Sequence, residues 1–466
     1  MKRSRLIRIF SALSGKERRE LRKWLLSPSH NQREDVILLH DYLFNVIDTK
    51  DAAALDKKVA FPYLYPKETF DDAKMRQVIF FSLKVVEEFL IYQELRKDEV
   101  RSRIALARIY RDRKLDKSYQ KAIKAAKTAH ESFPYRNEAF LQNEYLLQQE
   151  DYTYIVSQNR AIPMNLQEVS DALDRSYLAD RLRQSCHMLA HQKVYKTDYE
   201  SGLIDKVLLH VEHENFMDNP AIATYYFGYK AIVERENVDF FNQLKVQITK
   251  YGHLFPQSEI KDIYLVAINY CIGRVNQGER SFFRDMFDLY KLGLEEQVFI
   301  ESGIVSRYTF RNIVTTALVL KEFDWVEAFI IKYKVYLAEQ YRESFVHFNL
   351  SKLHFERGDY DEAMKLLSQF EYKDILLNLN AKAMLIKMYY EQDEMDTLES
   401  LLESVRNYLQ RKKIIAYHKS NYKNFIRFTK KLLKVNPYSE AQKAKLKKEI
   451  AAVSPLTEKA WLLKQL

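Results

Sequence analysis

The stretch FVHFNLSKLHFERGDYDEAMKLLSQF, residues 345–370, decides the fold class because it has the pattern of two helices joined by one short turn. Leu350 and Ser351 lie on the first expected helix, and the polar turn Gly358-Asp359-Tyr360 follows it. Ala363 gives the second helix a small residue at which the two helices can approach closely. A single hairpin cannot bury its own apolar face, so this stretch predicts a stack of hairpins.

The small residue Ala363 has counterparts at a constant spacing, since Ala328 and Leu398 each lie 35 residues away. The expected turns of these two neighbours are Phe323-Asp324-Trp325 and Asp393-Glu394-Met395, in which the glycine is replaced. These units therefore rest on the period and not on the full motif. The hairpin and its period resemble the tetratricopeptide repeat, which implies a curved stack whose first helices line a concave surface. A period of this length also suits pentatricopeptide RNA readers, but the Gly358-Asp359-Tyr360 turn favours the tetratricopeptide interpretation.

Composition supports an all-α chain. The 466 residues include only nine glycines and nine prolines, which leaves little turn chemistry for strands. We predict a helical-hairpin, tetratricopeptide-like solenoid preceded by a helical domain. Four segments are expected: an N-terminal helical domain (1–97), degenerate helical hairpins (98–306), tetratricopeptide-like repeats (307–409) and basic C-terminal capping helices (410–466).

Three further segments support this fold. They are LLSPSHN (25–31), NYCIGRVNQGER (269–280) and KEFDWVEAFI (321–330). Together with the repeat, they resemble a family of long, uncharacterised helical bacterial proteins. The resemblance covers nearly the whole chain and strengthens the expected fold, but it implies no function and no site residues.

Two amphipathic helices are expected in the N-terminal domain. The longer, residues 71–96, places six residues at helical spacing as core: Ile79, Phe80, Leu83, Val86, Phe89 and Leu90. The shorter sets Leu6, Ile9, Phe10 and Leu13 against Arg3, Arg5 and Arg8. A helix lying on a membrane surface has this pattern, and so has a first helix that docks on its own domain, which is the favoured interpretation.

No catalytic or metal-binding motif stands out. Cys186 and Cys271 are too few for a disulfide framework and indicate a reducing, cytoplasmic compartment. Gly273 and Gly278 have the glycine spacing of a phosphate-binding loop, but Glu279 and Arg280 replace its lysine and hydroxyl residue. Two histidine pairs have helical spacing but lack further ligands, and we expect them to be surface or packing residues: His187 with His191, and His210 with His213. We expect neither an enzyme nor a cofactor.

The tetratricopeptide resemblance implies which residues of the first helices face the concave side: Phe310, Phe348, Lys352, Phe355, Lys387 and Tyr390. Lys352 and Lys387 occupy equivalent positions one repeat apart and suit the carboxylates of an extended acidic peptide. Asn380 does not stand where the carboxylate-clamp proteins require it, so a chaperone tail is not favoured. The sequence predicts a groove for a protein or peptide partner.

The second candidate surface is basic. Residues 406–448 contain 14 Lys or Arg and one acid, Glu440. A helix from about Arg411 to Lys434 is expected, with an apolar stripe of Tyr422, Phe425, Ile426 and Leu433. A separate stripe of five cations extends over roughly 22 Å of helix: Lys419, Lys423, Arg427, Lys430 and Lys434.

This cationic stripe has two interpretations. It suits the phosphates of a nucleic acid, with Tyr417 and Phe428 placed to stack on bases or to pack on the following helix. The favoured interpretation is the solvated face of a terminal capping helix. We therefore expect a cytoplasmic, non-catalytic binding or scaffold protein for a protein or peptide partner. Nucleic-acid binding, RNA included, is the alternative, and the oligomeric state stays open.

Overall fold

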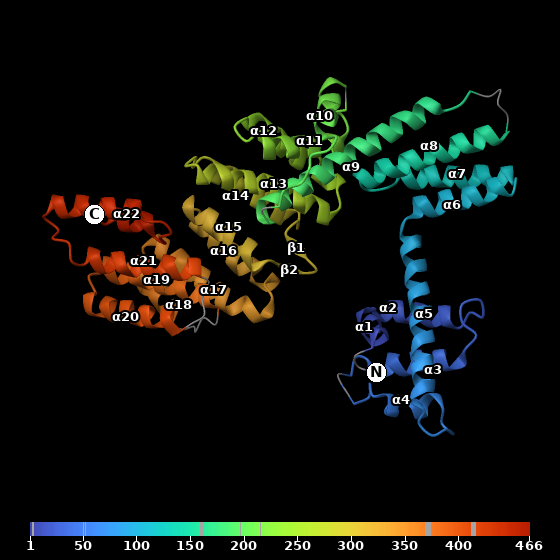
Figure 1. The fold of residues 1–466 in the computed structure, drawn as a ribbon, viewed down its shortest axis with the longest axis horizontal. Coiled ribbons are helices and arrows are strands. Elements are labelled where there is room, and N and C mark those ends of the chain that lie inside the picture. The colour runs from blue at the N-terminus through green and yellow to red at the C-terminus, as the bar shows by residue number, and fades with distance from the viewer. Residues whose placement is uncertain are drawn as a thin grey trace. The chain divides into compact units, whose positions relative to one another are not determined.

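The computed structural model of the chain describes residues 1, 4–49, 51, 53–158, 163–195, 197–214, 216–368, 374–411 and 416–466. Arg3 of the expected first helix, the end of the 345–370 hairpin and the first part of the expected basic helix lie outside these residues. The described residues are mostly helical, with one two-stranded sheet, so the chain is all-α (Figure 1). No helix among them is both long and apolar enough to cross a membrane.

The chain forms two compact units, Met1–Ala179 and Asp180–Leu466. Five helices at the start of the first unit share one core: α1 (Arg5–Ala12), α2 (Gly15–Leu25), α3 (Glu34–Val46), α4 (Lys57–Leu64) and α5 (Asp72–Lys97). Leu6, Phe10 and Leu13 are buried in this core, as docking of the first helix on its own domain predicts. Of the expected core residues of α5, Phe80 is wrong, because it lies on the other side of the helix from Val78 and Phe89 and is 62% exposed.

The rest of the first unit consists of longer helices: α6 (Glu99–Asp112), α7 (Asp116–Glu131), α8 (Glu138–Gln158) and the first part of α9 (Leu166–Tyr195). The hairpin of α6 and α7 packs through Tyr119, Ala122 and Ala126, which are buried. The hydroxyl of Tyr119 donates a hydrogen bond of 3.4 Å to the carbonyl of Glu150 on α8. The ring of Tyr119 stacks on Tyr154 at 3.8 Å, so α8 closes the core of this hairpin.

The second unit is built from successive helical hairpins (Figure 1). They follow the end of α9 in this order: α10 (Ile204–His213), α11 (Pro220–Val233), α12 (Val238–Tyr251), α13 (Gln257–Asn276), α14 (Phe282–Glu295), α15 (Arg307–Val319), α16 (Phe323–Tyr333), α17 (Glu339–Arg357), α18 (Tyr360–Ser368), α19 (Ile375–Glu391) and α20 (Met395–Arg411). First helices contact first helices, as α15 does α17 and α17 does α19. Two single turns of 3-10 helix interrupt the connections, Gly252–Leu254 and Lys334–Tyr336. This arrangement is a helical repeat compatible with a solenoid, and its tetratricopeptide character stays a prediction.

One hairpin turn recurs in both units. The first helix ends at a residue with positive φ, whose N–H donates to the carbonyl three residues back, while the next N–H donates to the carbonyl five residues before it. This double hydrogen bond satisfies the last carbonyls of a helix. Five residues hold the turn position: Lys114, Gly278, Lys321, Gly358 and Asp393. The turn is thus a structural repeat even where the glycine is missing.

The end of the second unit holds the basic segment. Three helices form it, α21 (Ala416–Leu432), α22 (Glu440–Ala452) and α23 (Lys459–Lys464). They share a core with α19 and α20 that includes Leu398, Phe425 and Ile450. Upstream, strands β1 (Ile300–Glu301) and β2 (Ile304–Val305) pair antiparallel, an element that the sequence did not predict. Its two-residue turn places both Ser302 and Gly303 at positive φ, the geometry of a tight hairpin.

Candidate functional site

A cavity of about 340 Å³ lies between the first helices α15, α17 and α19. Four of the six residues expected on the concave side line it: Phe348, Lys352, Phe355 and Lys387. They come from α17 and α19, where the 35-residue spacing of Lys352 and Lys387 brings both ammonium groups to one hollow. The structure therefore gathers most of the expected groove residues at a single place.

Lys352 is the central cation of this cavity. Its ammonium donates a hydrogen bond of 3.0 Å to the hydroxyl of Thr315 on α15. No ion pair joins Lys352 to a carboxylate in the described part of the chain, although Glu356 and Glu458 are close enough to favour its charged form. Burial outweighs these two charges and lowers the pKa of Lys352. An ammonium in this state gains from an anionic ligand, which would replace the water that it has lost.

Lys387 already has an anionic partner. The carboxylate of Glu458, in the segment between α22 and α23, pairs with its ammonium at 2.8 Å. The ammonium also lies over the ring of Phe355, 4.5 Å from its centroid. The Lys387 side chain is only 12% exposed as a result. The chain itself thus supplies an acid at one end of the cavity.

Two expected groove residues lie elsewhere. Phe310 is fully buried and packs on Phe329 of α16, 4.7 Å between ring centroids, so its placement on the concave side is wrong. The next residue along α15, Arg311, lines the cavity instead. Tyr390 is partly buried beneath the ring of Trp461, at 5.4 Å in an edge-on arrangement, and it does not line the cavity.

Six further lining residues contribute polar groups that the sequence did not single out for a groove: Arg311, Asn312, Thr315, Glu356, Asn380 and Glu458. Arg311, Asn312 and Thr315 follow Phe310 along α15. Once Phe310 is known to lie on the buried face of α15, helical spacing places these three residues on the cavity side. Asn380 accepts a hydrogen bond of 2.7 Å from the hydroxyl of Tyr422, so α21 fixes its amide. Glu458 could not be found from the repeat pattern, because it reaches the cavity from beyond the repeats.

Four of the five predicted cations lie on the basic helix α21, and Lys434 follows the end of this helix at Leu432. Part of this stripe is paired with carboxylates. Lys430 pairs with Glu403 at 3.3 Å, and its neighbour Lys431 pairs with Glu449 on α22. The other four cations of the stripe have no ion pair within the described residues: Lys419, Lys423, Arg427 and Lys434. The hydrogen bond from Lys431 and the charges of Lys431, Lys445 and Arg427 lower the pKa of Glu449. Basic groups of α21 and α22 therefore share one patch.

Of the two interpretations of Tyr417 and Phe428, the structure shows packing on the following helix for Phe428. Tyr417 is 60% exposed, whereas Phe428 is 1% exposed and belongs to the core with Leu446 and Ile450. A base cannot reach the ring of Phe428, because α22 packs over that side of α21. Any contact of this patch with a nucleic acid would be made through phosphates.

Neither histidine pair converges on further ligands, since no three His, Cys, Asp or Glu side chains gather at a point within the described chain. His191 stacks on Tyr195 at 4.3 Å and bonds the hydroxyl of Tyr199 at 3.0 Å. Both cysteines are buried, and burial raises the pKa of the Cys186 thiol to about 12. A buried thiol of raised pKa is a poor nucleophile.

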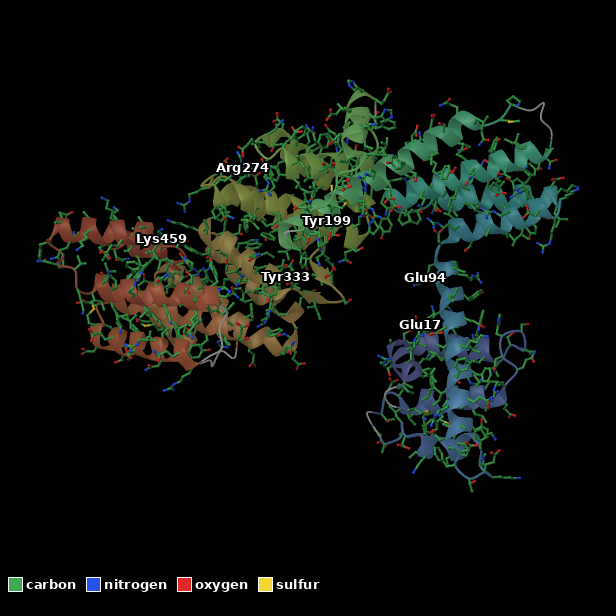
Figure 2. The ribbon with its side chains drawn as sticks, viewed as in Figure 1. Glu17, Glu94, Tyr199, Arg274, Tyr333 and Lys459 are labelled. Carbon is green, nitrogen blue, oxygen red and sulfur yellow. The ribbon has the colours of Figure 1, made fainter. Side chains whose placement is uncertain are left out.

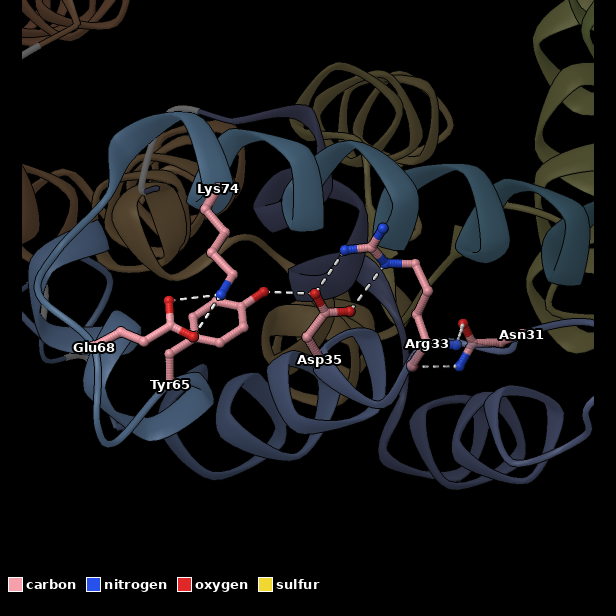
Figure 3. Close-up of polar contacts among 6 residues, drawn as sticks. All are labelled: Asn31, Arg33, Asp35, Tyr65, Glu68 and Lys74. Atoms are coloured by element: carbon pink, nitrogen blue, oxygen red, sulfur yellow. Dashed lines mark hydrogen bonds and ion pairs between the residues drawn. The ribbon is translucent and has the colours of Figure 1, made fainter.

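A polar network joins helices α3 and α5 of the N-terminal domain with the segments beside them (Figure 3). Asp35 receives two hydrogen bonds from the guanidinium of Arg33, at 3.0 and 2.7 Å, and one of 2.5 Å from the hydroxyl of Tyr65. The ammonium of Lys74 bonds both oxygens of Glu68 at 2.6 Å. Because these charged groups are paired with one another, the network is suited to stabilising the packing of these segments.

No family model matches this chain, and neither the curated proteins nor the solved structures yield a match.

Proposed function

We propose that the chain is a non-catalytic binding protein whose helices α15, α17 and α19 hold an acidic segment of a partner protein. The observation that carries this proposal is the ammonium of Lys352, which lies in a cavity with a hydroxyl as its hydrogen-bond partner and no described carboxylate paired to it. A carboxylate of the partner would complete its coordination. The guanidinium of Arg311, at the exposed edge of the same cavity, would receive a second acid.

The walls of the cavity support a peptide as the ligand. Phe348, Phe355 and Met384 offer apolar surface, while the amides of Asn312 and Asn380 offer donors and acceptors for a peptide backbone. Apolar walls with a few placed polar groups are typical of specific binding sites. The cavity is too small for a folded domain, so a segment of the partner would enter it.

The internal acid Glu458 defines which part of the cavity the partner would use. Since Glu458 pairs with Lys387, and Trp461 covers Tyr390, this end is occupied by the C-terminal segment. The side that includes Lys352, Thr315 and Arg311 would receive the partner first. We therefore expect Lys352 to matter more for binding than Lys387.

The test is capture of partner proteins from a lysate of the source cells on the immobilised full chain, followed by mass spectrometry. Lys352→Ala and Phe355→Ala should release the proteins that the wild type captures. The matched control is Lys365→Ala on α18, an exposed lysine on a second helix. Retention of every captured protein by both cavity variants would refute the groove, and equal loss with the control variant would show nonspecific capture.

A second function is favoured by the basic patch of α21 and α22. Lys423, Arg427 and Lys434 are exposed, and several phosphates could bind along them. Labelled RNA or DNA should bind more weakly as salt rises, and Lys423→Glu with Arg427→Glu should reduce the slope of this dependence. The control is Lys16→Glu with Lys23→Glu on α2. Absence of binding at low salt would exclude this function.

A further inference from the structure

A second hollow, which we call the apolar trough, lies between α9, α11 and α13 and has a volume of about 420 Å³. One wall runs along α11 from Thr224 and continues to Arg235, two residues beyond the end of that helix, and the other runs along α13 from Asp262 to Gly273. At 1.5 Å per residue each wall is roughly 16 Å long. The two helices point the same way, because Tyr225 bonds Glu259 near one end and Tyr270 bonds Arg235 near the other. The trough therefore has two distinct ends.

Small residues create this space. Gly228, Ala231 and Gly273 line the trough from within helices α11 and α13. A glycine inside a helix is destabilising relative to alanine. Because the chain has only nine glycines, those inside α11 and α13 indicate that packing at these positions requires a residue without a side chain. At Gly273, an added Cβ would come 3.4 Å from a guanidinium nitrogen of Arg235. The glycine lets the Arg235 side chain lie against α13.

Arg235 is held at one end of the trough by its main chain. Its carbonyl accepts hydrogen bonds from the hydroxyl of Tyr270 at 2.9 Å and from the guanidinium of Arg274 at 3.1 Å. Arg274 is labelled in Figure 2. Its Nε donates to the carbonyl of Ile232 at 3.3 Å. No carboxylate pairs with the Arg235 guanidinium among the residues described, so a positive charge stands at this end.

The opposite end differs in charge. Asp262 is exposed there, and Thr224, which is 1% exposed, has a hydroxyl without a hydrogen-bond partner in the described chain. Between the ends the lining is apolar, with Ala190, Leu265 and Val266. An anionic group would be attracted to Arg235 and repelled by Asp262, which fixes the direction in which a ligand lies. The volume falls within the range of small-molecule sites, about 300–1,000 Å³.

We propose that the apolar trough binds a small amphiphile with an aliphatic body and a single anionic group, of the alkyl carboxylate class. The anion pairs with Arg235, and the aliphatic body lies along α11 and α13 toward Thr224. This site is separate from the cavity of Lys352, and it does not depend on the partner proposed there.

Calorimetric titration of the full chain tests this proposal with three probes of equal chain length: dodecanoate, dodecyltrimethylammonium and dodecanol. The two ionic probes are kept below their micelle concentrations, and dodecanol is kept below its solubility limit. Dodecanoate should saturate one site and bind at least about tenfold more tightly than the cation, because one charged hydrogen bond carries that much discrimination. Arg235→Met should lower dodecanoate affinity about tenfold, to that of dodecanol. Lys206→Met, an exposed charge on α10, is the control and should change nothing.

A second variant separates the trough from other apolar surfaces. Ala190 is exposed at the trough, so Ala190→Trp should fill it without disturbing the core and should abolish binding of dodecanoate. Circular dichroism checks that both variants remain folded. The proposal is overturned if the cationic probe binds as tightly as dodecanoate, if Ala190→Trp leaves binding unchanged, or if no saturation occurs up to about 1 mM.

Discussion

Glu458 pairs with Lys387 at 2.8 Å across 71 residues of chain, so one cation of the candidate groove holds an acid of the same molecule. The contact is supported by the indole N–H of Trp461, which donates to Glu391 at 2.7 Å. The α19 partners of these two contacts are Lys387, which donates to Glu458, and Glu391, which accepts from Trp461 at the end of the helix. The C-terminal segment is thus positioned where an acidic partner would bind, and it competes with such a partner for Lys387.

Glu458→Gln should weaken this internal contact. The pair is partly buried, so its loss should cost about 1 kcal/mol and raise amide hydrogen exchange in α23 about fivefold. Partner proteins that depend on Lys352 should then be captured in greater amount, because Lys387 becomes available. Asp361→Asn, an acid on α18 outside the cavity, is the control. Unchanged exchange in α23 would show that Trp461 alone holds the segment.

The hairpin turns provide a paired prediction on stability. Gly358 has φ of 90° and Lys321 has φ of 60°, although L side chains are strained in this region. Gly358→Ala should destabilise the chain by about 1 kcal/mol, whereas Lys321→Gly should stabilise it by a similar amount. Denaturant unfolding measures both variants. A stabilising Gly358→Ala would mean that the turn rearranges when its glycine is lost.

These turns show which turn positions could be predicted from the sequence and which could not. The Gly358 turn was predicted from its residue types, and Asp393 takes the same conformation one period later. The upstream counterpart was wrongly placed, because the turn residue is Lys321 and not Phe323, which begins α16. A lysine gives no local signal for positive φ; the packing of the two helices imposes it.

Those residues of the candidate groove that recur with the helical repeat could be predicted from the sequence. Lys352 and Lys387 share a cavity because their spacing equals one repeat. Phe310 was misplaced, and the sequence left both interpretations of Phe428 open, because an aromatic residue beside a polar face can turn toward either neighbouring helix. Only the packing of α16 and α22 decides this. The return of Glu458 depends on tertiary folding of the terminal helices, which no local pattern encodes.

His130 should give the first unit a defined pH dependence. Its ring stacks on Phe140 at 4.0 Å, and burial together with the nearby charge of Arg136 lowers its pKa to about 4. The unfolded chain has a pKa near 6.5 at this residue and binds the proton first, so the stability contribution is complete above about pH 6.5. It is lost as pH falls toward 4, by up to about 3 kcal/mol.

His130→Phe keeps the stacked ring and removes the titrating group. Unfolding free energies of wild type and variant, measured from pH 7.5 to pH 4 at fixed ionic strength, should therefore diverge in favour of the variant as the pH falls. Exposed His187→Phe is the control, and it should parallel the wild type. Parallel curves for His130→Phe and wild type would refute the neutral, buried state of His130.

The charged network around Asp35 should stabilise the N-terminal domain at neutral pH, and this stabilisation should be lost in acid. Burial alone would raise the pKa of Asp35, but hydrogen bonds from Arg33 and Tyr65 outweigh it and lower that pKa. The stabilisation is therefore present above the pKa of an unfolded aspartate, about 3.9, and is lost as pH falls through the lower pKa of the folded state. Asp35→Asn should cost about 2 kcal/mol at pH 7 and much less at pH 2, as urea unfolding at the two values would show. Asp361→Asn on α18 provides the matched control. An equal cost of Asp35→Asn at both pH values would mean that the asparagine side chain fits the site poorly and that the charge pairing of Asp35 contributes no stability.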